Sequence, residues 1–303
     1  MKQIASLVRN AVAATLAGVA LAALASGASA EITIQMQDRE VARMVSLGGS
    51  CARCELSGRN LSGATLTGAN FVNATLVGAN LRGAELIGSN FSGSDFSRAD
   101  MNGVEMIGAN FTNAVFTRAN LNGAEASGAT LVQTIFEDAN LSSSELNGAN
   151  FNRANLTRTN LSNSEMFGVT LANVRAQGAD FSNAEINASN LSNGLFDRAN
   201  FSNASLDSAR LTGGSFDRAN FSNASLNRAD IRGADLSRAR GLTQDQVSEA
   251  CADGSTRLPS GIQPNSCGMR RMRIVPPPPA PPAPPAPPAP PRPRHFVMAD
   301  SDR

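Results

Sequence analysis

Residues 196–206 read FDRANFSNASL, and residues 216–226 repeat the same eleven residues without a change. The two copies are twenty residues apart, and within each copy a large apolar residue twice follows an Ala and a polar residue. A chain that stacks copies of one short unit produces such a pattern, because each unit buries its apolar side chain against the next. The stretch therefore predicts a repeat protein.

The five-residue pattern extends far beyond these two copies. Every fifth residue from Leu56 to Leu236 is Leu, Phe, Met or Ile in a run of 37 positions, with Ala126 and Ala176 as the two exceptions. The residue two places earlier is Ala in 23 of these positions, and the residue two places later is Gly or Asn in 24. Alternate side chains of an extended segment share one face, so the Ala and the large residue point inward together. Gly and Asn tolerate positive φ, which lets the chain turn after each segment.

Exposed charges indicate how many segments make one coil. Glu and Arg each recur on a twenty-residue grid, so four five-residue segments complete a coil, and Asp138 and Gly178 fill the gaps in the Arg series. The apolar positions beside the two series differ by ten residues, or half a coil, which predicts that they lie on opposite faces of a square rod. The candidate interaction faces are the Glu row, Glu85, Glu105, Glu125, Glu145, Glu165 and Glu185, and the Arg row, Arg98, Arg118, Arg158, Arg198, Arg218 and Arg238.

The pattern in Ala69-Asn70-Phe71 and Ala149-Asn150-Phe151 resembles the pentapeptide-repeat family. This resemblance implies an all-β fold, a right-handed quadrilateral β-helix over residues 54–240, to which the flanking residue patterns add short helical caps. Thirty-seven segments make about nine coils, and about 4.8 Å per coil gives a rod about 44 Å long. The resemblance brings no catalytic residues. The flanking stretches 51–58 and 241–261 look like the ends of exported members.

Residues 1–30 form a predicted signal peptide. Lys2 and Arg9 precede the uncharged apolar run 11–25, and Ala28-Ser29-Ala30 fits a cleavage site. The apolar run is short for a membrane span, and we expect a periplasmic or secreted protein without a stable membrane anchor after cleavage. An uncleaved N-terminal anchor is the alternative.

Three further segments complete the organisation. Residues 31–53 form an N-terminal cap with a short strand near 32–36 and a helical turn near 41–45. Residues 241–268 form a C-terminal cap, in which Thr243 and Gln246 predict a capping box for a helix from about 244 to 252. Val247 and Ala250 would face the last coil. Residues 269–303 form a tail that we expect to be disordered or a stiff polyproline II spacer, although PPRPR at 290–294 could dock on an aromatic groove.

Four cysteines occur in the predicted mature chain. We expect two local disulfides that pin the caps, Cys51–Cys54 and Cys251–Cys267, since export allows disulfides to form. Haem attachment would need a His at position 55, where Glu55 stands, and zinc would need four ligands that the length of the rod keeps apart. Thiol–disulfide catalysis is the remaining alternative for Cys51 and Cys54, although no βαβ pattern surrounds them.

Composition bounds the function. The formal net charge is +1, Trp and Tyr are absent, and His295 in the tail is the only histidine. We therefore expect no enzyme, cofactor, metal site or nucleic-acid ligand, but a structural scaffold or interaction rod that binds an unknown protein partner or itself. One alternative is a DNA-mimicking topoisomerase inhibitor, an activity known in the family, although such rods are strongly acidic and residues 55–240 carry 17 Asp and Glu against 14 Arg. A β-helix enzyme acting on polysaccharide would need clustered carboxylates and aromatic platforms.

The Glu row has two interpretations. Duplication of one coil would have copied its exposed Glu without any selection for binding. Alternatively, the row is a ligand surface that meets a basic partner, a cation or the Arg row of a second rod. Solvated like charges at this spacing are tolerated in salt, and the sequence leaves both interpretations open.

Overall fold

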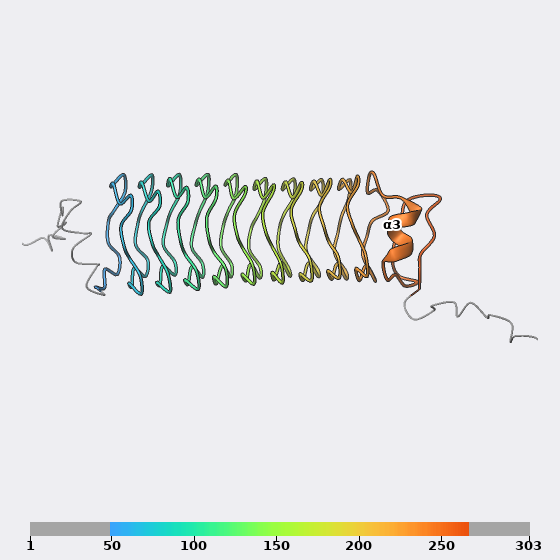
Figure 1. Ribbon diagram of the computed structural model, residues 1–303, viewed down its shortest axis with the longest axis horizontal. Coiled ribbons are helices and arrows are strands. Elements are labelled where there is room, and N and C mark those ends of the chain that lie inside the picture. Colours follow the sequence, from blue (N-terminus) through green and yellow to red (C-terminus); the bar gives the residue numbers. More distant parts are fainter. Residues whose placement is uncertain (1–48, 267–303) are drawn as a thin grey trace, which may run out of the picture. The chain divides into compact units, whose positions relative to one another are not determined.

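A computed structural model describes residues 49–266 of the chain (Figure 1). The predicted signal peptide, the expected N-terminal strand and helical turn, Cys267 and the Pro-rich tail lie outside these residues. Most of the described chain is a stack of closely similar coils, and the single named helix, α3, follows them (Figure 1).

Each coil takes twenty residues and has four sides. Parallel β-bridges join residues twenty apart without interruption from Ser50 and Asn70 to Asn220 and Arg240. One bridge occurs in every five-residue segment, and a turn separates each bridge from the next. The twenty-residue register and the four-segment coil are as the sequence predicted, and the described chain is a quadrilateral β-helix.

In the five-residue segment 80–84, every backbone N–H group has a hydrogen-bond acceptor. The N–H groups of Leu81 and Gly83 donate to carbonyls of the next coil at 2.7 and 3.0 Å, and the N–H of Asn80 donates to the previous coil at 2.9 Å. Ala84 closes the turn by donating to the Leu81 carbonyl at 3.0 Å. The fifth N–H, that of Arg82, donates to the Asn80 side-chain Oδ1 at 3.2 Å. An Asn or Asp before the large apolar residue thus satisfies the one amide that neither the coils nor the turn can use.

The residue two places after each large side chain occupies the left-handed region. Gly and Asn fill most of these positions, as predicted, but Arg98 and Arg118 adopt φ of 59° there as well. Among residues 49–266, 21 non-glycine residues have positive φ, all at this place in the segment. A left-handed L-residue costs about 1–2 kcal/mol, so the continuous inter-coil ladder imposes this conformation on residues that do not favour it.

The large apolar positions form the core. Phe116 is fully buried, and its ring stacks on Phe96 and Phe136 with centroid distances of 5.0 and 4.6 Å and interplanar angles of 5° and 3°. These residues are twenty apart, so the coil register itself places like rings above one another. The predicted column of stacked rings is confirmed.

Helix α3 spans Gln244–Glu249 and covers the C-terminal end of the last coil. The capping box forms between Thr243 and Gln246, and Val247 is fully buried. The Gln246 side-chain amide also donates to two carbonyls of the last coil, those of Phe221 and Ala224, at 2.9 and 2.8 Å. The Ala224 carbonyl has no donor from a following coil among the described residues, and the Phe221 carbonyl accepts this bond in addition to the one within its own turn.

The helix is shorter than the sequence predicted. Ala250 is extended, with φ −91° and ψ 165°, and Cys251 pairs with Asp230 of the preceding coil. The chain leaves the helix at Glu249 because Cys251 and Ala252 return to β-bridges. Within residues 49–266, no helix has the length and apolar character needed to cross a membrane.

Candidate interaction surface

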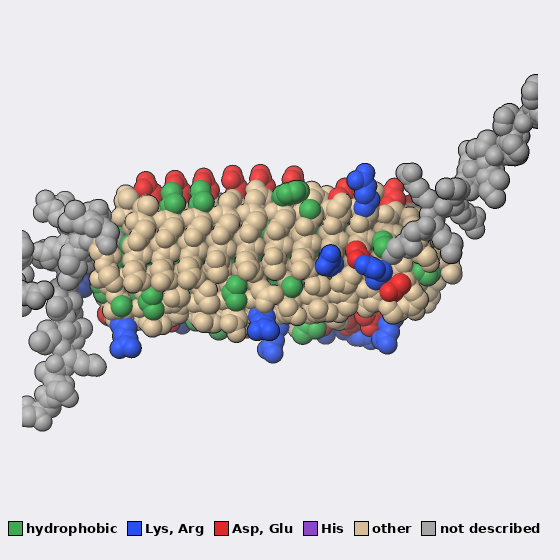
Figure 2. All heavy atoms as spheres, turned by 90° about the horizontal axis from the view of Figure 1, so that it is seen from below, with side chains coloured by type: hydrophobic (Ala, Val, Ile, Leu, Met, Phe, Trp, Pro, Cys, Tyr) green, Lys and Arg blue, Asp and Glu red, His purple; other side chains and the backbone are tan. Residues whose placement is uncertain are grey.

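The Glu row forms the outward column of one side of the β-helix, which we call the acidic side. Consecutive members are bridge partners, from Glu85 and Glu105 to Glu165 and Glu185. The bridge spacing places neighbouring Cα atoms about 4.8 Å apart. Glu85 and Glu105 are half-buried, and the other four are exposed. Acidic side chains accordingly line one edge of the view in Figure 2.

The Glu row has no countercharge at contact distance within the described part of the chain. None of the ion pairs found between residues 49 and 266 includes a member of this row. Directly opposed like charges on a sheet are unfavourable, and salt reduces this repulsion. The acidic side is therefore an uncompensated line of carboxylates.

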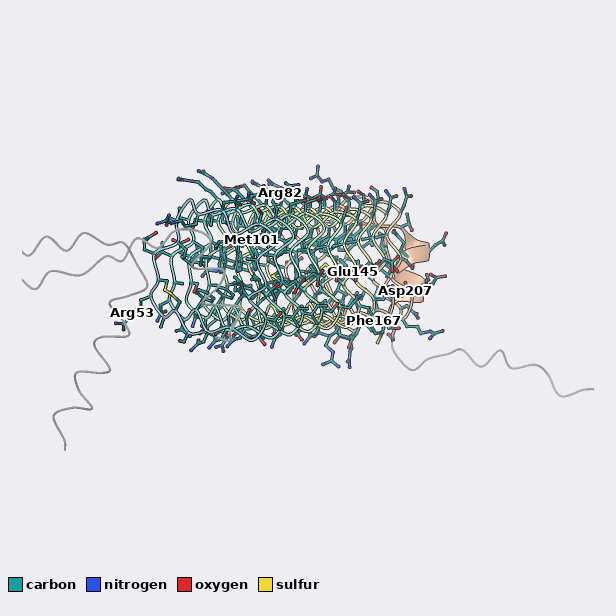
Figure 3. All side chains as sticks on the ribbon, turned by 60° about the vertical axis from the view of Figure 1, so that its left-hand side comes forward. Arg53, Arg82, Met101, Glu145, Phe167 and Asp207 are labelled. Carbon is teal, nitrogen blue, oxygen red and sulfur yellow. A yellow bond between two sulfur atoms is a disulfide. The ribbon has the colours of Figure 1, made fainter. Side chains whose placement is uncertain are left out.

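Bulky apolar side chains flank this line. Ile107 and Phe167 follow Glu105 and Glu165 by two residues, in the turn that ends the acidic side, and 39% and 62% of their surfaces are exposed. The backbone N–H of Phe167 donates to Asn147 Oδ1 at 2.9 Å, so the turn is fixed while the ring faces solvent. Figure 3 labels Phe167 together with Glu145 of the row. Phe167 is one of two Phe residues outside the five-residue grid, and the repeat pattern alone does not indicate its exposure.

The Arg row lies at an edge, and not on the face that the sequence predicted. Arg98 occupies the turn after residues 94–96, which belong to the side opposite the acidic side. Five of the six members, Arg238 being the exception, have the positive φ of that turn position. The left-handed residue of each turn lies between two sides of the β-helix and not on a sheet face. The Arg row therefore projects from the corner between the opposite side and the side that follows it in the chain.

Carboxylates compensate much of the Arg row. Asp138 accepts from Arg158 Nε at 2.6 Å and lies 3.8 Å from Arg118 Nε, while Glu137 lies 2.6 Å from Arg158 Nη2. The hydrogen bonds from Arg158 hold the pKa of Asp138 below its usual value and raise the pKa of the guanidinium. The Arg row is thus a mixed edge, in contrast to the Glu row.

The side between the Arg row and the acidic side carries a ladder of amides. Asn140 Nδ2 donates to Asn120 Oδ1 at 3.2 Å, and Asn160 Nδ2 donates to Asn140 Oδ1 at 3.1 Å. The same oxygens also accept backbone N–H groups of their own turns. These amides therefore satisfy one another along this Asn side, whose column also holds the carboxylates Asp100 and Asp180.

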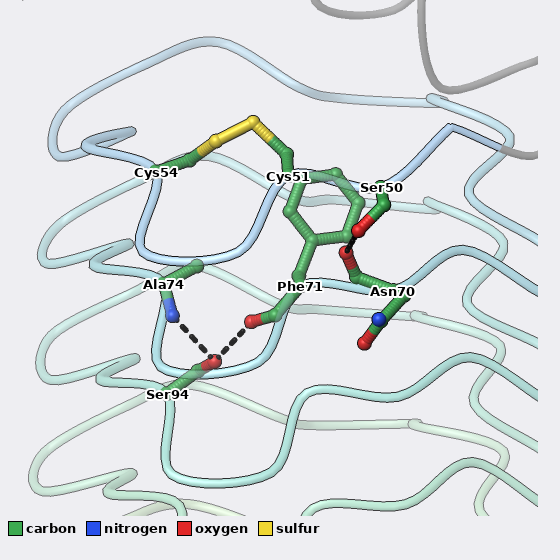
Figure 4. The surroundings of a disulfide bond; sticks show 7 residues. All are labelled: Ser50, Cys51, Cys54, Asn70, Phe71, Ala74 and Ser94. Carbon is green, nitrogen blue, oxygen red and sulfur yellow. Dashed lines mark hydrogen bonds between the residues drawn. A yellow bond between two sulfur atoms is a disulfide. The ribbon is translucent and has the colours of Figure 1, made fainter.

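Cys51 and Cys54 are joined by a disulfide with their Cα atoms 5.5 Å apart (Figure 4). They precede Phe71 and Ala74 by one coil, so they occupy the positions of a large and a small core residue at the N-terminal end of the stack. In the following coil, the Ser94 hydroxyl donates to the Phe71 carbonyl at 2.7 Å and accepts from the Ala74 N–H at 3.0 Å. The disulfide therefore continues the core column at its end.

Cys251 also takes part in a disulfide. Its expected partner, Cys267, lies outside the described residues, so the pair Cys251–Cys267 stays a prediction. A redox role for Cys51 and Cys54 is likewise a hypothesis that the geometry leaves open.

Two polar depressions lie beside helix α3. One has a volume of about 430 Å³ and is lined by Asp207, Ser208, Asn227, Arg228 and Glu249. The Asp207 carboxylate already accepts from the Ser225 hydroxyl and from the backbone and side-chain amides of Asn227. Across residues 49–266, no three His, Cys, Asp or Glu side chains group in a way that could hold a metal ion. The depression is consequently a weaker candidate than the acidic side.

Comparisons with known proteins agree on the repeat. A family model described as pentapeptide repeats matches residues 54–93, 94–133, 134–171, 164–203 and 204–240. No curated protein sequence matches the chain.

Solved structures of repeat proteins are also similar to this chain. One is HetL from the cyanobacterium Nostoc, a pentapeptide-repeat protein involved in heterocyst differentiation regulation, with 31% identity, coverage of 73% of this chain and 98% of HetL, and a TM-score of 0.44. Another is QnrB1, a plasmid-mediated fluoroquinolone resistance protein, with 19% identity, coverage of 68% and 93%, and a TM-score of 0.27. A pentapeptide-repeat protein of the Arabidopsis thaliana thylakoid lumen has 27% identity, coverage of 40% and 66%, and a TM-score of 0.16.

Proposed function

Because the chain belongs to the pentapeptide-repeat family, we propose that it is a non-catalytic, exported interaction rod that binds a basic protein partner along the Glu row. The observation that carries this proposal is the contrast between the two charged rows. Six Glu residues on consecutive coils have no ion-pair partner among the described residues, whereas Asp138, Glu137 and Asp217 compensate the Arg row.

The repeated charge of the Glu row lowers the stability of the free rod. A column of like charges opposes folding by a few tenths of a kcal/mol per neighbouring pair. Lys and Arg side chains of a partner would relieve this repulsion and form charge-assisted hydrogen bonds. Six equally spaced carboxylates favour an extended basic partner over a compact one, since each coil presents the same contact.

Export is part of the proposal. The signal-peptide pattern at 1–30 and the disulfide between Cys51 and Cys54 both support an oxidising compartment. Mass spectrometry of the chain from the exported fraction should give a mature N-terminus at Glu31. A full-length chain retained in the cytoplasm would contradict export.

A cross-linking experiment tests the interaction surface. A photoreactive residue replaces Ser127, in the turn that ends the acidic side, or Thr117, in the turn that ends the opposite side, and each variant is irradiated in extract of the exported fraction. We expect a discrete adduct from position 127 that disappears when Glu105, Glu125 and Glu145 become Gln. Equal adducts from both positions, or an adduct that survives the Gln substitutions, would favour simple coil duplication as the origin of the Glu row.

A further inference from the structure

We propose that the C-terminal end of the Glu row, at Glu165 and Glu185, together with Phe167, binds the basic segment 269–275 of the same chain. This segment reads MRRMRIV and begins just beyond the described residues. The inference is independent of the proposed function, because an intramolecular contact requires no partner.

Charge complementarity is the first argument. Residues 49–266 contain 20 Asp and Glu against 16 Arg, which gives a net charge of −4, whereas residues 267–303 contain six Arg against two Asp, which gives +4. Three of those six Arg, Arg270, Arg271 and Arg273, fall within four residues. The tail is therefore the most basic stretch available to a row of carboxylates without countercharge.

The apolar pattern is the second argument. Met269, Met272 and Ile274 are interspersed with the Arg residues of the segment, and Phe167 is the most exposed large hydrophobic residue that the structure describes, at 62%. A guanidinium can pair with a Glu carboxylate and stack on a Phe ring, and Met side chains pack readily against aromatic rings. Glu165 and Phe167 are two residues apart, so a bound segment can form the ion pair and the contact with the ring at the same place.

The reach of the chain is the third argument. Ser266 bridges Ala252, and Cys251 continues the column of Asn190, Arg210 and Asp230 on the side next to the acidic side. Counting bridges back along this column places the Glu185 coil about four spacings, or about 19 Å, from Ser266. The seven residues from Ser266 to Arg273 extend up to about 24 Å. Arg273 can therefore reach Glu185, and its long side chain extends toward Glu165.

The proline run limits the contact to this end of the row. Residues 276–293 contain thirteen Pro, and a polyproline II segment of this length spans about 56 Å. Only five coil spacings, about 24 Å, separate Glu185 from Glu85. A stiff run along the rod would carry Arg292 and Arg294 past the row, so only the segment 269–275 fits the acidic side of its own chain.

The sequence offers a direct test because Lys2 is the only lysine. In the full chain, Lys2→Arg combined with Arg271→Lys creates a single lysine in the basic segment. A zero-length carbodiimide reagent then joins this amine only to a carboxylate in contact with it. The matched control combines Lys2→Arg with Arg294→Lys, which places the single lysine beyond the proline run.

We expect an amide between residue 271 and Glu165 or Glu185 in the monomer band. Its yield should exceed that from residue 294 and should fall at least about fivefold in 0.5 M salt, where the Debye length is about 4 Å. Phe167→Ser should also lower the yield without unfolding the rod, since the ring is on the surface. Coupling to carboxylates of the opposite side, coupling only in a dimer band, or equal yields from residues 271 and 294 would each overturn the proposal.

Discussion

Arg158 and Asp138 lie one coil apart on the same edge of the β-helix, and the guanidinium donates to both carboxylate oxygens, from Nε to Oδ1 at 2.6 Å and from Nη2 to Oδ2 at 3.1 Å. Asp138 is the one carboxylate in a register that otherwise holds Arg or Gly. Arg118 approaches it from the other neighbouring coil. One acidic residue is thus shared between two guanidinium groups that would otherwise face its position as like charges.

Asp138→Asn should lower the stability of the rod at low salt. Asn keeps the size of the side chain and tolerates the φ of 59° at this position, so the change removes mainly the ion pairs. Thermal unfolding at low and high ionic strength is the measurement, and the difference from the parent should shrink as salt rises. An equal loss of stability at both ionic strengths would indicate a steric cause.

Acid should remove the same contribution. The pKa of Asp138 is lowered in the folded chain by Arg158, so its contribution is complete above the usual Asp pKa of about 3.9 and is lost as the pH falls through the lower folded value. Unfolding midpoints of the parent and of Asp138→Asn should therefore converge at the acid end of a pH series. Parallel curves throughout would contradict this linkage.

Asp253 should give a second, better-defined acid transition. Hydrogen bonds from the Ser255 hydroxyl and backbone, the Thr256 hydroxyl and the Gly233 backbone lower the pKa of Asp253 to about 2. Its contribution is present above the usual value of about 3.9 and is lost between there and about pH 2. The stability of Asp253→Asn should approach that of the parent across this range. Thr256→Val, which removes one donor, should shift the transition toward higher pH.

Phe116→Ala should cost about 3–5 kcal/mol of unfolding free energy, because it removes a fully buried ring between two stacked rings. Phe167→Ala should change stability by less than about 0.5 kcal/mol, since that ring is on the surface. Denaturant unfolding compares the two. Similar losses would contradict the assignment of Phe116 to the core and Phe167 to the surface.

Replacing Glu105, Glu125 and Glu145 by Gln should stabilise the rod at low salt by a few tenths of a kcal/mol for each like-charge neighbour removed.

Sedimentation of the parent chain and of this Gln variant measures whether the rod associates with itself. A parent chain that is dimeric at low salt, with a monomeric Gln variant, would point to the Arg row of a second rod as the partner. A monomer in both cases is expected if the partner is a different basic protein.

The repeat could be predicted because every five-residue segment has the same order of small, polar, large apolar and turn residues. Phe96, Phe116 and Phe136 are twenty residues apart, and no other period brings them into one buried column. The capping box at Thr243 could also be predicted, because it depends on two residues that are three apart in one turn of the chain. Most of the fold could therefore be predicted, because it depends on local and repeated features of the sequence.

Features that depend on one side chain reaching another coil were not predicted. The ion pair of Arg158 with Asp138 requires the rotamers of two residues at a left-handed turn position, and the bonds from Gln246 to the carbonyls of Phe221 and Ala224 require the orientation of α3. The place of the Arg row at an edge was missed because the period locates a segment on a side but does not fix where each turn residue projects. The exposure of Phe167 could not be predicted because the repeat pattern constrains the buried positions and leaves the surface turn positions free.

The uniform twenty-residue register has a consequence for how the chain tolerates length changes. Excision of residues 201–220 would join Asn200 to Phe221, restore the same local sequence, and shorten the rod by one step of about 4.8 Å with all outward columns in phase. Excision of only residues 131–135 would also preserve the buried pattern, but it would rotate every later side chain by a quarter turn. Glu145, Glu165 and Glu185 would then leave the line of Glu85, Glu105 and Glu125. The buried core therefore tolerates changes in length of five residues, whereas the outward columns of side chains stay aligned only when a whole coil of twenty residues is added or removed.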